Sequence, residues 1–197
     1  MSGMPKKNIV LIGLMGAGKT TIGRRLAQRI QWPLVDTDHW IEERCGTSVA
    51  NIFEVEGEAG FRARESKALA EIMATPGQIV TTGGGAPVQK ANRPLIALGF
   101  VVYLQAQPRQ LWQRLRHDAS RPLLTQSDDP RTTLETLYEA RDPVYRELAT
   151  VIVPSSQGSP SQVVSQVLGH LLAAGLISNA SGEVYHDTDS TSHASGP

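Results

Sequence analysis

The chain has a single cysteine, Cys45, among its 197 residues. No intramolecular disulfide can form, which is typical of a protein that works in a reducing compartment such as the cytoplasm. The sequence also lacks an excess of either charge, because 19 lysine and arginine residues balance 19 aspartate and glutamate residues. Nucleic-acid-binding proteins normally carry a basic surplus, so this balance argues against a nucleic-acid partner.

Long apolar runs are missing too, and none approaches the ~20 residues needed to cross a bilayer. We therefore expect no membrane association and a cytoplasmic protein, and the family resemblance given below further implies a monomer. A signal peptide would be cleaved inside the glycine-rich motif described below, so residues 1–7 are expected to be a short N-terminal extension. Residues 177–197 are rich in Ser, Thr, Gly, Asp and His, which predicts a disordered C-terminal tail. The remaining residues, 8–176, suffice for one domain with a sizeable core.

Residues 13–20, Gly-Leu-Met-Gly-Ala-Gly-Lys-Thr, fit the phosphate-binding loop pattern of Gly, four residues and Gly-Lys-Thr. The glycines let several backbone N–H groups point into one hollow, and the start of the following helix favours phosphate. Lys19 can reach the outer phosphates of a nucleotide, and Thr20 offers a hydroxyl to Mg²⁺. An apolar strand precedes the loop and a helical stretch follows it. The alternative is a glycine-rich turn with an exposed lysine, but the full pattern predicts binding of a nucleoside triphosphate.

Apolar runs suited to strands alternate with amphipathic stretches suited to helices. We expect strands at Asn8–Leu14, Pro33–Asp36, Gln78–Thr82, Phe100–Leu104 and Thr150–Val153. We expect helices at Lys19–Ile30, His39–Cys45, Ser48–Glu54, Gly57–Ala74, Val88–Leu98, Pro108–Arg116, Pro130–Leu148 and Pro160–Ala174. This alternation predicts one doubly wound α/β domain with a parallel sheet covered on both faces. Residues 117–129 interrupt the pattern as a mobile lid would, or as a plain surface loop.

Ligands of such folds bind beyond the carboxyl ends of the strands, where this chain carries unusual residues. Asp36 and Asp38 follow the second expected strand, on what we expect to be an extended segment. One carboxylate could hold Mg²⁺, directly or through water, while the other could orient or deprotonate an attacking hydroxyl. Either could instead cap the helix expected near His39. Three glycines, residues 83–85, follow the third strand. They could let a ligand come close to the main chain, or they could form a flexible turn.

Three arginines are candidate anion ligands, because a guanidinium fork suits a carboxylate or a phosphate. Arg62 lies in an expected helix with Glu58 and Glu65 on the same face, so it could also form only a surface ion pair. Arg141 follows a long helical stretch, and Arg121 lies in the expected lid. From the residues alone, we expect that one or two of these three arginines contact a ligand.

Taken together, six segments in this order and spacing resemble shikimate kinase. They are Gly13–Thr21, Asp36–Asp38, Phe61–Glu65, Gly83–Ala86, Arg121–Leu124 and Arg141–Tyr145. The resemblance runs from about residue 7 to residue 172. It implies the three-layer fold of the nucleoside monophosphate kinases among the P-loop NTPases, with a five-stranded parallel sheet and a mobile lid. It also implies ATP-dependent phosphorylation of the 3-hydroxyl of shikimate, the fifth step of the shikimate pathway.

The resemblance implies roles for the phosphate loop and its surroundings. The residues that would hold the ATP phosphates are Gly16, Ala17, Gly18, Lys19, Thr20 and Thr21. Thr20 would ligate Mg²⁺, and Asp36 would serve the magnesium shell. Arg121 would reach the phosphates from the lid and would join Lys19 in stabilising the transferred group. Gln157 would contact adenine.

The resemblance also implies a set of residues for the acceptor. Asp38 would bind the shikimate hydroxyls and is the candidate general base. Arg62 and Arg141 would clamp the substrate carboxylate, and Gly84 would contact the substrate through its backbone. These roles agree with the reading from the residues, because phosphoryl transfer depends on positioning and on neutralising negative charge.

Three other functions are alternatives to this one. A gluconate kinase shares the phosphate loop and also takes a carboxylated polyol, but three segments together favour shikimate: Asp36–Asp38, Gly83–Gly85 and Arg121–Leu124. A nucleotide-dependent switch of the GTPase class would carry an Asn-Lys-x-Asp segment, which the chain lacks. A non-catalytic homologue would usually have lost one of four residues, and all four are present: Lys19, Asp38, Arg62 and Arg141.

Overall fold

The protein is built around a five-stranded parallel sheet, seen here in a computed structural model that describes residues 7–116, 127–156 and 158–178. The strands are β1 (Ile9–Ile12), β2 (Leu34–Asp36), β3 (Ile79–Thr81), β4 (Phe100–Gln105) and β5 (Val151–Pro154). Their order across the sheet is β2-β3-β1-β4-β5, with β1 in the centre. All pairs are parallel, for example Val10 opposite Val80 of β3 and Val101 of β4. The expected parallel sheet and each of its five strands are confirmed.

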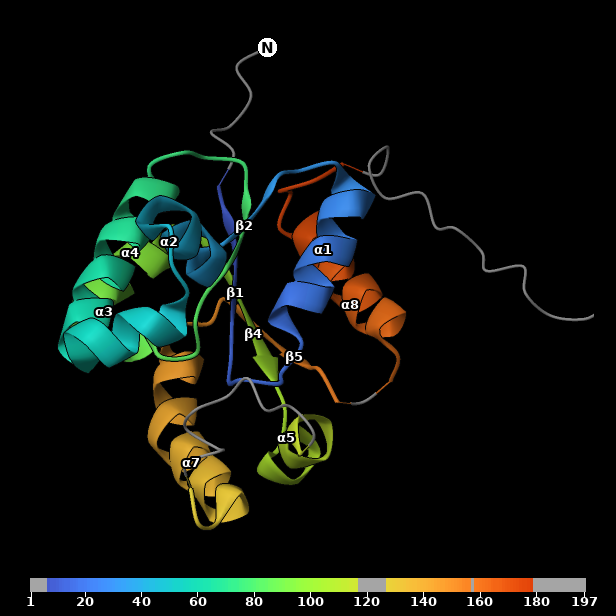
Figure 1. Ribbon diagram of the computed structural model, residues 1–197. Coiled ribbons are helices and arrows are strands. Elements are labelled where there is room, and N and C mark those ends of the chain that lie inside the picture. The colour runs from blue at the N-terminus through green and yellow to red at the C-terminus, as the bar shows by residue number, and fades with distance from the viewer. Residues whose placement is uncertain (1–6, 117–126, 157, 179–197) are drawn as a thin grey trace, which may run out of the picture.

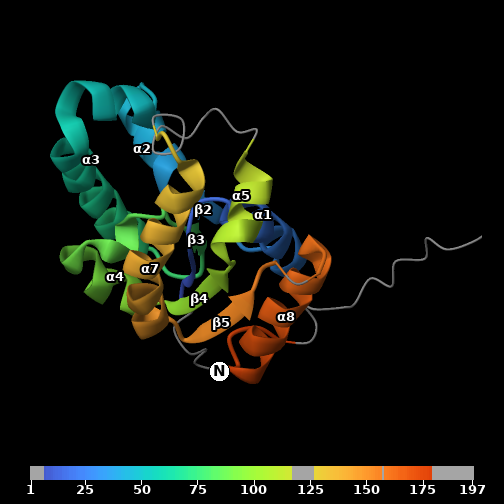
Figure 2. The same ribbon diagram turned by 90° about the horizontal axis from the view of Figure 1, so that it is seen from below.

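Helices cover both faces of this sheet and make a three-layer structure (Figure 1). On one face lie α1 (Lys19–Ile30) and α8 (Pro160–Ala173). On the other lie α3 (Val49–Met73), α4 (Arg93–Ala97) and α7 (Pro130–Leu148), as the view from below also shows (Figure 2). Two further helices, α2 (Thr37–Cys45) and α5 (Pro108–Leu115), pack on α3 and α7 respectively.

Prolines and polar caps explain several of these helix starts. α5, α7 and α8 each begin with proline, whose missing N–H is harmless in the first turn. The Asp129 side chain accepts hydrogen bonds from two N–H groups at the start of α7, and the Ser159 side chain does so from one at the start of α8. The expected starts at residues 108, 130 and 160 are confirmed.

Two expected elements differ in the structure. The helix expected at Val88–Leu98 is instead two short 3₁₀ turns, Ala86–Val88 and Lys90–Asn92, followed by the five-residue α4. Pro94 can stand only in the first turn of a helix, and the Asn92 side chain binds the Ala86 carbonyl at 3.0 Å, which favours turns over a helix. The extended segment expected at residues 36–38 is also wrong, because β2 ends at Asp36 and α2 begins at once.

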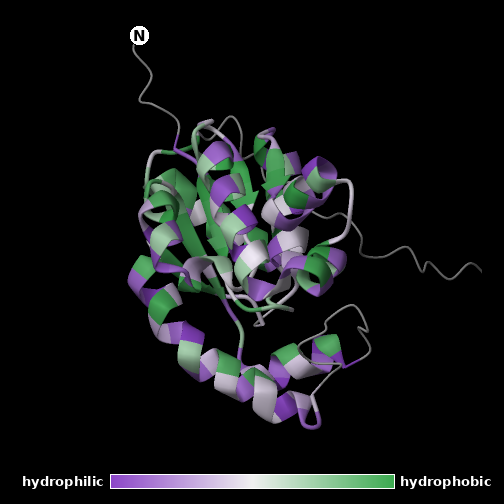
Figure 3. Cartoon of the chain, turned by 60° about the vertical axis from the view of Figure 1, so that its left-hand side comes forward, coloured by the Kyte–Doolittle hydropathy of each residue, from purple (hydrophilic) through white to green (hydrophobic). Residues whose placement is uncertain are grey.

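The core lies on both sides of β1, whose four residues are all fully buried. Strand residues at the centre are hydrophobic, while the helices turn hydrophilic residues outward (Figure 3). Such near-continuous apolar strands are typical of a parallel sheet covered on both faces. Among the described residues, no helix is long and apolar enough to span a membrane.

Candidate active site

A cavity of about 670 Å³ opens at the carboxyl ends of β1, β2 and β3. The phosphate loop lines one wall, and Asp36, Asp38, Gly83 and Gly84 line another. Most of the predicted nucleotide ligands line this space: Gly16, Ala17, Gly18, Lys19, Thr20 and Thr21. The chain therefore brings its three unusual strand ends to one hollow, as the rule for ligand sites in such sheets predicts.

The phosphate loop leaves the central strand and turns directly into α1. Gly16 and Gly18 have φ angles of 77° and 94°, which side-chain-bearing residues rarely adopt. The Lys19 ammonium group donates to the carbonyls of Gly13 at 2.8 Å and Leu14 at 3.0 Å. Lys19 is thus held across the loop, at the start of a helix whose positive end favours anions.

Asp36 joins the phosphate loop to the acceptor side of the cavity. Its Oδ2 accepts hydrogen bonds from the hydroxyls of Thr20 at 3.1 Å and Thr81 at 2.7 Å. Its Oδ1 accepts from the backbone N–H groups of Asp38 at 3.1 Å and His39 at 3.4 Å. The capping role considered for Asp36 is therefore present, together with direct contact to the predicted magnesium ligand Thr20.

Arg62 is not a simple surface residue, although it forms both ion pairs that its spacing allows. The second half of α3 carries it, beyond a break at Gly57, where φ is 69° and ψ is −177°. Its Nη1 lies 2.8 Å from Glu65 Oε2 and its Nη2 lies 3.2 Å from Glu58 Oε1. The Arg62 side chain is only 17% exposed and that of Glu65 only 1%, so the pair is largely removed from water.

Glu65 is a buried carboxyl in the middle of the charged groups. Burial raises its pKa, Arg62 and Arg141 lower it, and the charge of Asp38 raises it, with a raised pKa as the result. Its second oxygen, Oε1, is buried without a hydrogen-bond partner among the described residues. Both Glu65 Oε1 and Asp38 Oδ1 lie 2.9 Å from where a Cβ on Gly83 would be. A side chain at position 83 would therefore displace one or both of these carboxyl groups.

The two predicted carboxylate ligands lie against neighbouring glycines. A Cβ on Gly85 would lie 2.5 Å from Nη1 and Nη2 of Arg62, and a Cβ on Gly84 would lie 3.5 Å from Nη1 of Arg141. The glycine segment thus passes between an arginine of α3 and an arginine of α7, beside the cavity that holds Lys19 and Asp38. The segment therefore comes close to both arginines, while its approach to a ligand stays a prediction.

We expect Gly85→Ala to displace the Arg62 guanidinium and to raise the KM for the acceptor at least tenfold, while the KM for ATP changes little. The added methyl group has no room beside Arg62, and a contact of this kind costs on the order of 1–3 kcal/mol. Steady-state kinetics with each substrate varied in turn will measure this. Gly169→Ala is the matched control, since a Cβ there meets nothing within 4 Å. An unchanged KM for the acceptor in Gly85→Ala would contradict the prediction that Arg62 binds the acceptor carboxylate.

Three further residues of this site have no role predicted from the sequence. The helix spacing indicates Glu65 only as a possible surface partner of Arg62 and does not show that Glu65 is buried. Tyr145 belongs to a segment that carries the family resemblance, but the segment alone assigns no role to it. Arg114 had no signal at all; it lines the cavity and donates to the carbonyls of Gly16 at 3.0 Å and Ser155 at 2.8 Å.

Two predicted site residues, Arg121 and Gln157, lie outside the described part of the chain. So does the expected lid at residues 117–129, apart from residues 127–129. The predicted tail is described only as far as Ser178. The predictions for these residues stay predictions.

Known proteins resemble the chain over most of its length. A family model described as shikimate kinase matches residues 15–172. A shikimate kinase of Burkholderia pseudomallei is 49% identical over 174 residues, which are 88% of this chain and 94% of that protein. One of Aromatoleum aromaticum is 51% identical over 160 residues, 81% of this chain and 91% of that protein. The solved structure of an Acinetobacter baumannii shikimate kinase in complex with shikimate has a TM-score of 0.82 and 41% identity, covering 87% of this chain and 96% of that one.

Proposed function

This chain belongs to the shikimate kinase family, and from that premise we propose that it transfers the terminal phosphoryl group of ATP to the 3-hydroxyl of shikimate. It is a phosphotransferase with an alcohol group as acceptor, and its product is shikimate 3-phosphate, on the route to the aromatic amino acids. One observation of the fold carries the proposal. Arg62 and Arg141 lie against the adjacent glycines Gly85 and Gly84, and Gly84 lines the same cavity as Lys19 and Asp38.

The acceptor would be bound by its carboxylate and oriented by its hydroxyls. Arg62 and Arg141 provide two guanidinium forks for one carboxylate, with the backbone of Gly84 beside them. Asp38 faces the same cavity from the first turn of α2 and would accept the proton of the attacking hydroxyl. Glu65 would hold Arg62 in position for this binding.

ATP would lie with its phosphates along the loop and the start of α1. The backbone N–H groups of residues 16–21 and the Lys19 ammonium group would neutralise the charge that spreads over the transferred group. Arg121 is proposed to add a second positive charge, and Gln157 to contact adenine. Little covalent chemistry is asked of the protein, so alignment of the two substrates provides most of the rate enhancement.

The residues fit a magnesium ion bound together with nucleotide. Mg²⁺ usually keeps several waters and takes one or two protein ligands plus phosphate oxygens. Thr20 and Asp36, joined at 3.1 Å, offer such a partial site, and no cluster of three metal-ligating side chains occurs within residues 7–116, 127–156 and 158–178. Thr20 would bind the ion directly, and Asp36 would hold its water shell. The ion would supply positive charge that neutralises the phosphates.

Purified protein with ATP, Mg²⁺ and shikimate tests the proposal when ADP release is followed. We expect ADP release to require shikimate, to be absent with gluconate, and to stop when EDTA removes the metal. Release with gluconate instead of shikimate would support the alternative kinase. Nucleotide binding without ADP release for either acceptor would support a non-catalytic homologue. Neither alternative is favoured by the family assignment.

A further inference from the structure

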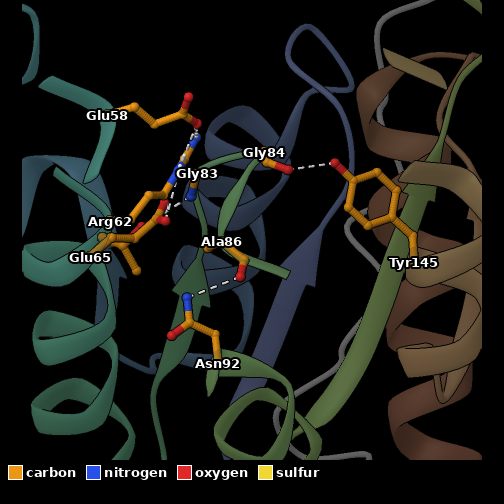
Figure 4. Close-up of polar contacts among 9 residues, drawn as sticks. Glu58, Arg62, Glu65, Gly83, Gly84, Ala86, Asn92 and Tyr145 are labelled. Carbon is orange, nitrogen blue, oxygen red and sulfur yellow. Dashed lines mark hydrogen bonds and ion pairs between the residues drawn. The ribbon is translucent and has the colours of Figure 1, made fainter. Parts of the chain in front are cut away.

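Tyr145 connects α7 to the glycine segment through its side chain. Its hydroxyl donates a hydrogen bond of 2.6 Å to the carbonyl oxygen of Gly84. Figure 4 shows Tyr145 on one side of the segment and Arg62, from α3, on the other. The Tyr145 side chain is fully buried, so water does not compete for this bond.

Both local and distant groups bind the backbone of the segment. The carbonyls of Gly83 and Gly85 accept from the nearby N–H groups of Ala86 and Val88, while the Gly83 N–H donates to the Thr37 hydroxyl of α2 at 3.0 Å. The Gly84 carbonyl is bound from α7, 61 residues along the chain. Because a peptide unit is planar and trans, fixing this carbonyl also fixes the Gly85 N–H, which points the opposite way.

Tyr145 is also linked to the second arginine of the site. Arg141 lies four residues earlier on α7, so the two side chains share a face of the helix. Burial raises the pKa of Tyr145 to about 12, although the charge and the hydrogen-bonding of Arg141 lower it. The hydroxyl therefore remains a proton donor at neutral pH, between Arg141 and the Gly84 carbonyl.

A second tyrosine, Tyr103, packs against the ring of Tyr145, but its hydroxyl bonds elsewhere than to the glycine segment. The ring centroids of Tyr103 and Tyr145 are 5.1 Å apart, and both side chains are buried. The Tyr103 hydroxyl donates to Asp142 at 2.8 Å, away from Gly84. The chain thus contains a matched residue of the same type and burial.

We propose that Tyr145 is a positioning residue for the acceptor: its hydroxyl sets the Gly84–Gly85 peptide unit and the spacing between Arg62 and Arg141 that receives a carboxylate. This inference rests on the function proposed above. It predicts that the hydroxyl affects binding of the acceptor and not of ATP. The hydroxyl is expected to act on the arrangement of its neighbours, without contact to the reacting atoms.

Tyr145→Phe tests the proposal because it removes the hydroxyl and keeps the ring. We expect the KM for shikimate to rise about tenfold, because the partly buried Gly84 carbonyl loses its partner. The KM for ATP should stay within about twofold, and kcat should fall by less than the KM rises. Tyr103→Phe is the control and should leave the KM for shikimate within about twofold. An unchanged KM for shikimate in Tyr145→Phe, or equal changes in both variants, overturns the proposal.

A donor placed back on the ring gives a second test, which holds even if Tyr145→Phe does not fold. A chain with p-aminophenylalanine at position 145 keeps the ring and an N–H donor, and we expect it to bind shikimate within about threefold of the wild type. A loss as large as that of a missing hydroxyl would count against the proposal. The wild-type protein is assayed alongside: no turnover of shikimate by it would refute the proposed function itself, whereas an active wild type with an insensitive Tyr145→Phe refutes only the role of Tyr145.

Discussion

Lys19→Met is expected to lower kcat by about 10³-fold, the cost of losing one preorganised charge that stabilises a transition state. Methionine has a similar length and no charge, so the loop should keep its shape while the outer phosphates lose their ammonium partner. The KM for shikimate should change little, since the acceptor is bound on the other side of the cavity. ADP release at saturating concentrations of both substrates will measure the effect.

Lys67→Met is the matched control for this variant, because Lys67 is exposed on α3. It should keep full activity and the wild-type melting temperature. A kcat for Lys19→Met within tenfold of the wild type would show that the transferred phosphoryl group does not depend on this lysine. The loop would then have a role in binding alone.

Arg62→Ala is expected to raise the dissociation constant of shikimate about 100-fold, because losing a partly buried charge-assisted contact costs on the order of 3 kcal/mol. ATP affinity should stay nearly intact. Calorimetric titration of each substrate separately distinguishes the two effects. Arg64→Ala is the control, because Arg64 pairs with Glu56 at the surface and is 45% exposed. Unchanged shikimate affinity in Arg62→Ala would defeat the proposed carboxylate clamp.

Arg62→Ala should also lower the free energy of unfolding, by an amount that depends on the pH. Without Arg62, the already raised pKa of Glu65 rises further, because burial remains and the cation is gone. The folded state then holds a proton that the unfolded chain has released, so the free energy of unfolding falls as the pH rises above about 4.3. Urea unfolding between pH 4 and pH 8 will show this. Adding Glu65→Gln should remove the pH dependence without restoring shikimate affinity, which separates folding from binding.

Sequence periodicity was sufficient for the sheet and most helices, because buried parallel strands are almost wholly apolar and several helices start at a proline. It failed at residues 86–98, where the Asn92 side chain competes with helical hydrogen bonds. It failed at Asp36 as well, because an aspartate that caps a helix and an aspartate that ends a strand look the same in the sequence. Whether such a side chain bonds to the backbone depends on which backbone groups the fold places near it.

The cavity could be predicted in outline, since parallel strands place their carboxyl ends at one edge. The sequence could not show that Arg62 of α3 and Arg141 of α7 lie against two adjacent glycines, because these helices are far apart in the chain. Burial of Glu65 was hidden for a related reason: a glutamate three residues from an arginine is usually a surface partner. The hydrogen bond from Tyr145 to Gly84 joins residues that are 61 positions apart, so no local sequence pattern predicts it.

The pairing of Arg62 with Glu65 has a consequence for affinity. A free arginine on a surface samples many rotamers, and fixing it takes up to about 2 kcal/mol of conformational entropy. In this chain a buried carboxylate already restrains the guanidinium at 2.8 Å. The loss of freedom therefore occurs when the polypeptide folds, and an arriving carboxylate meets a side chain that has little left to lose.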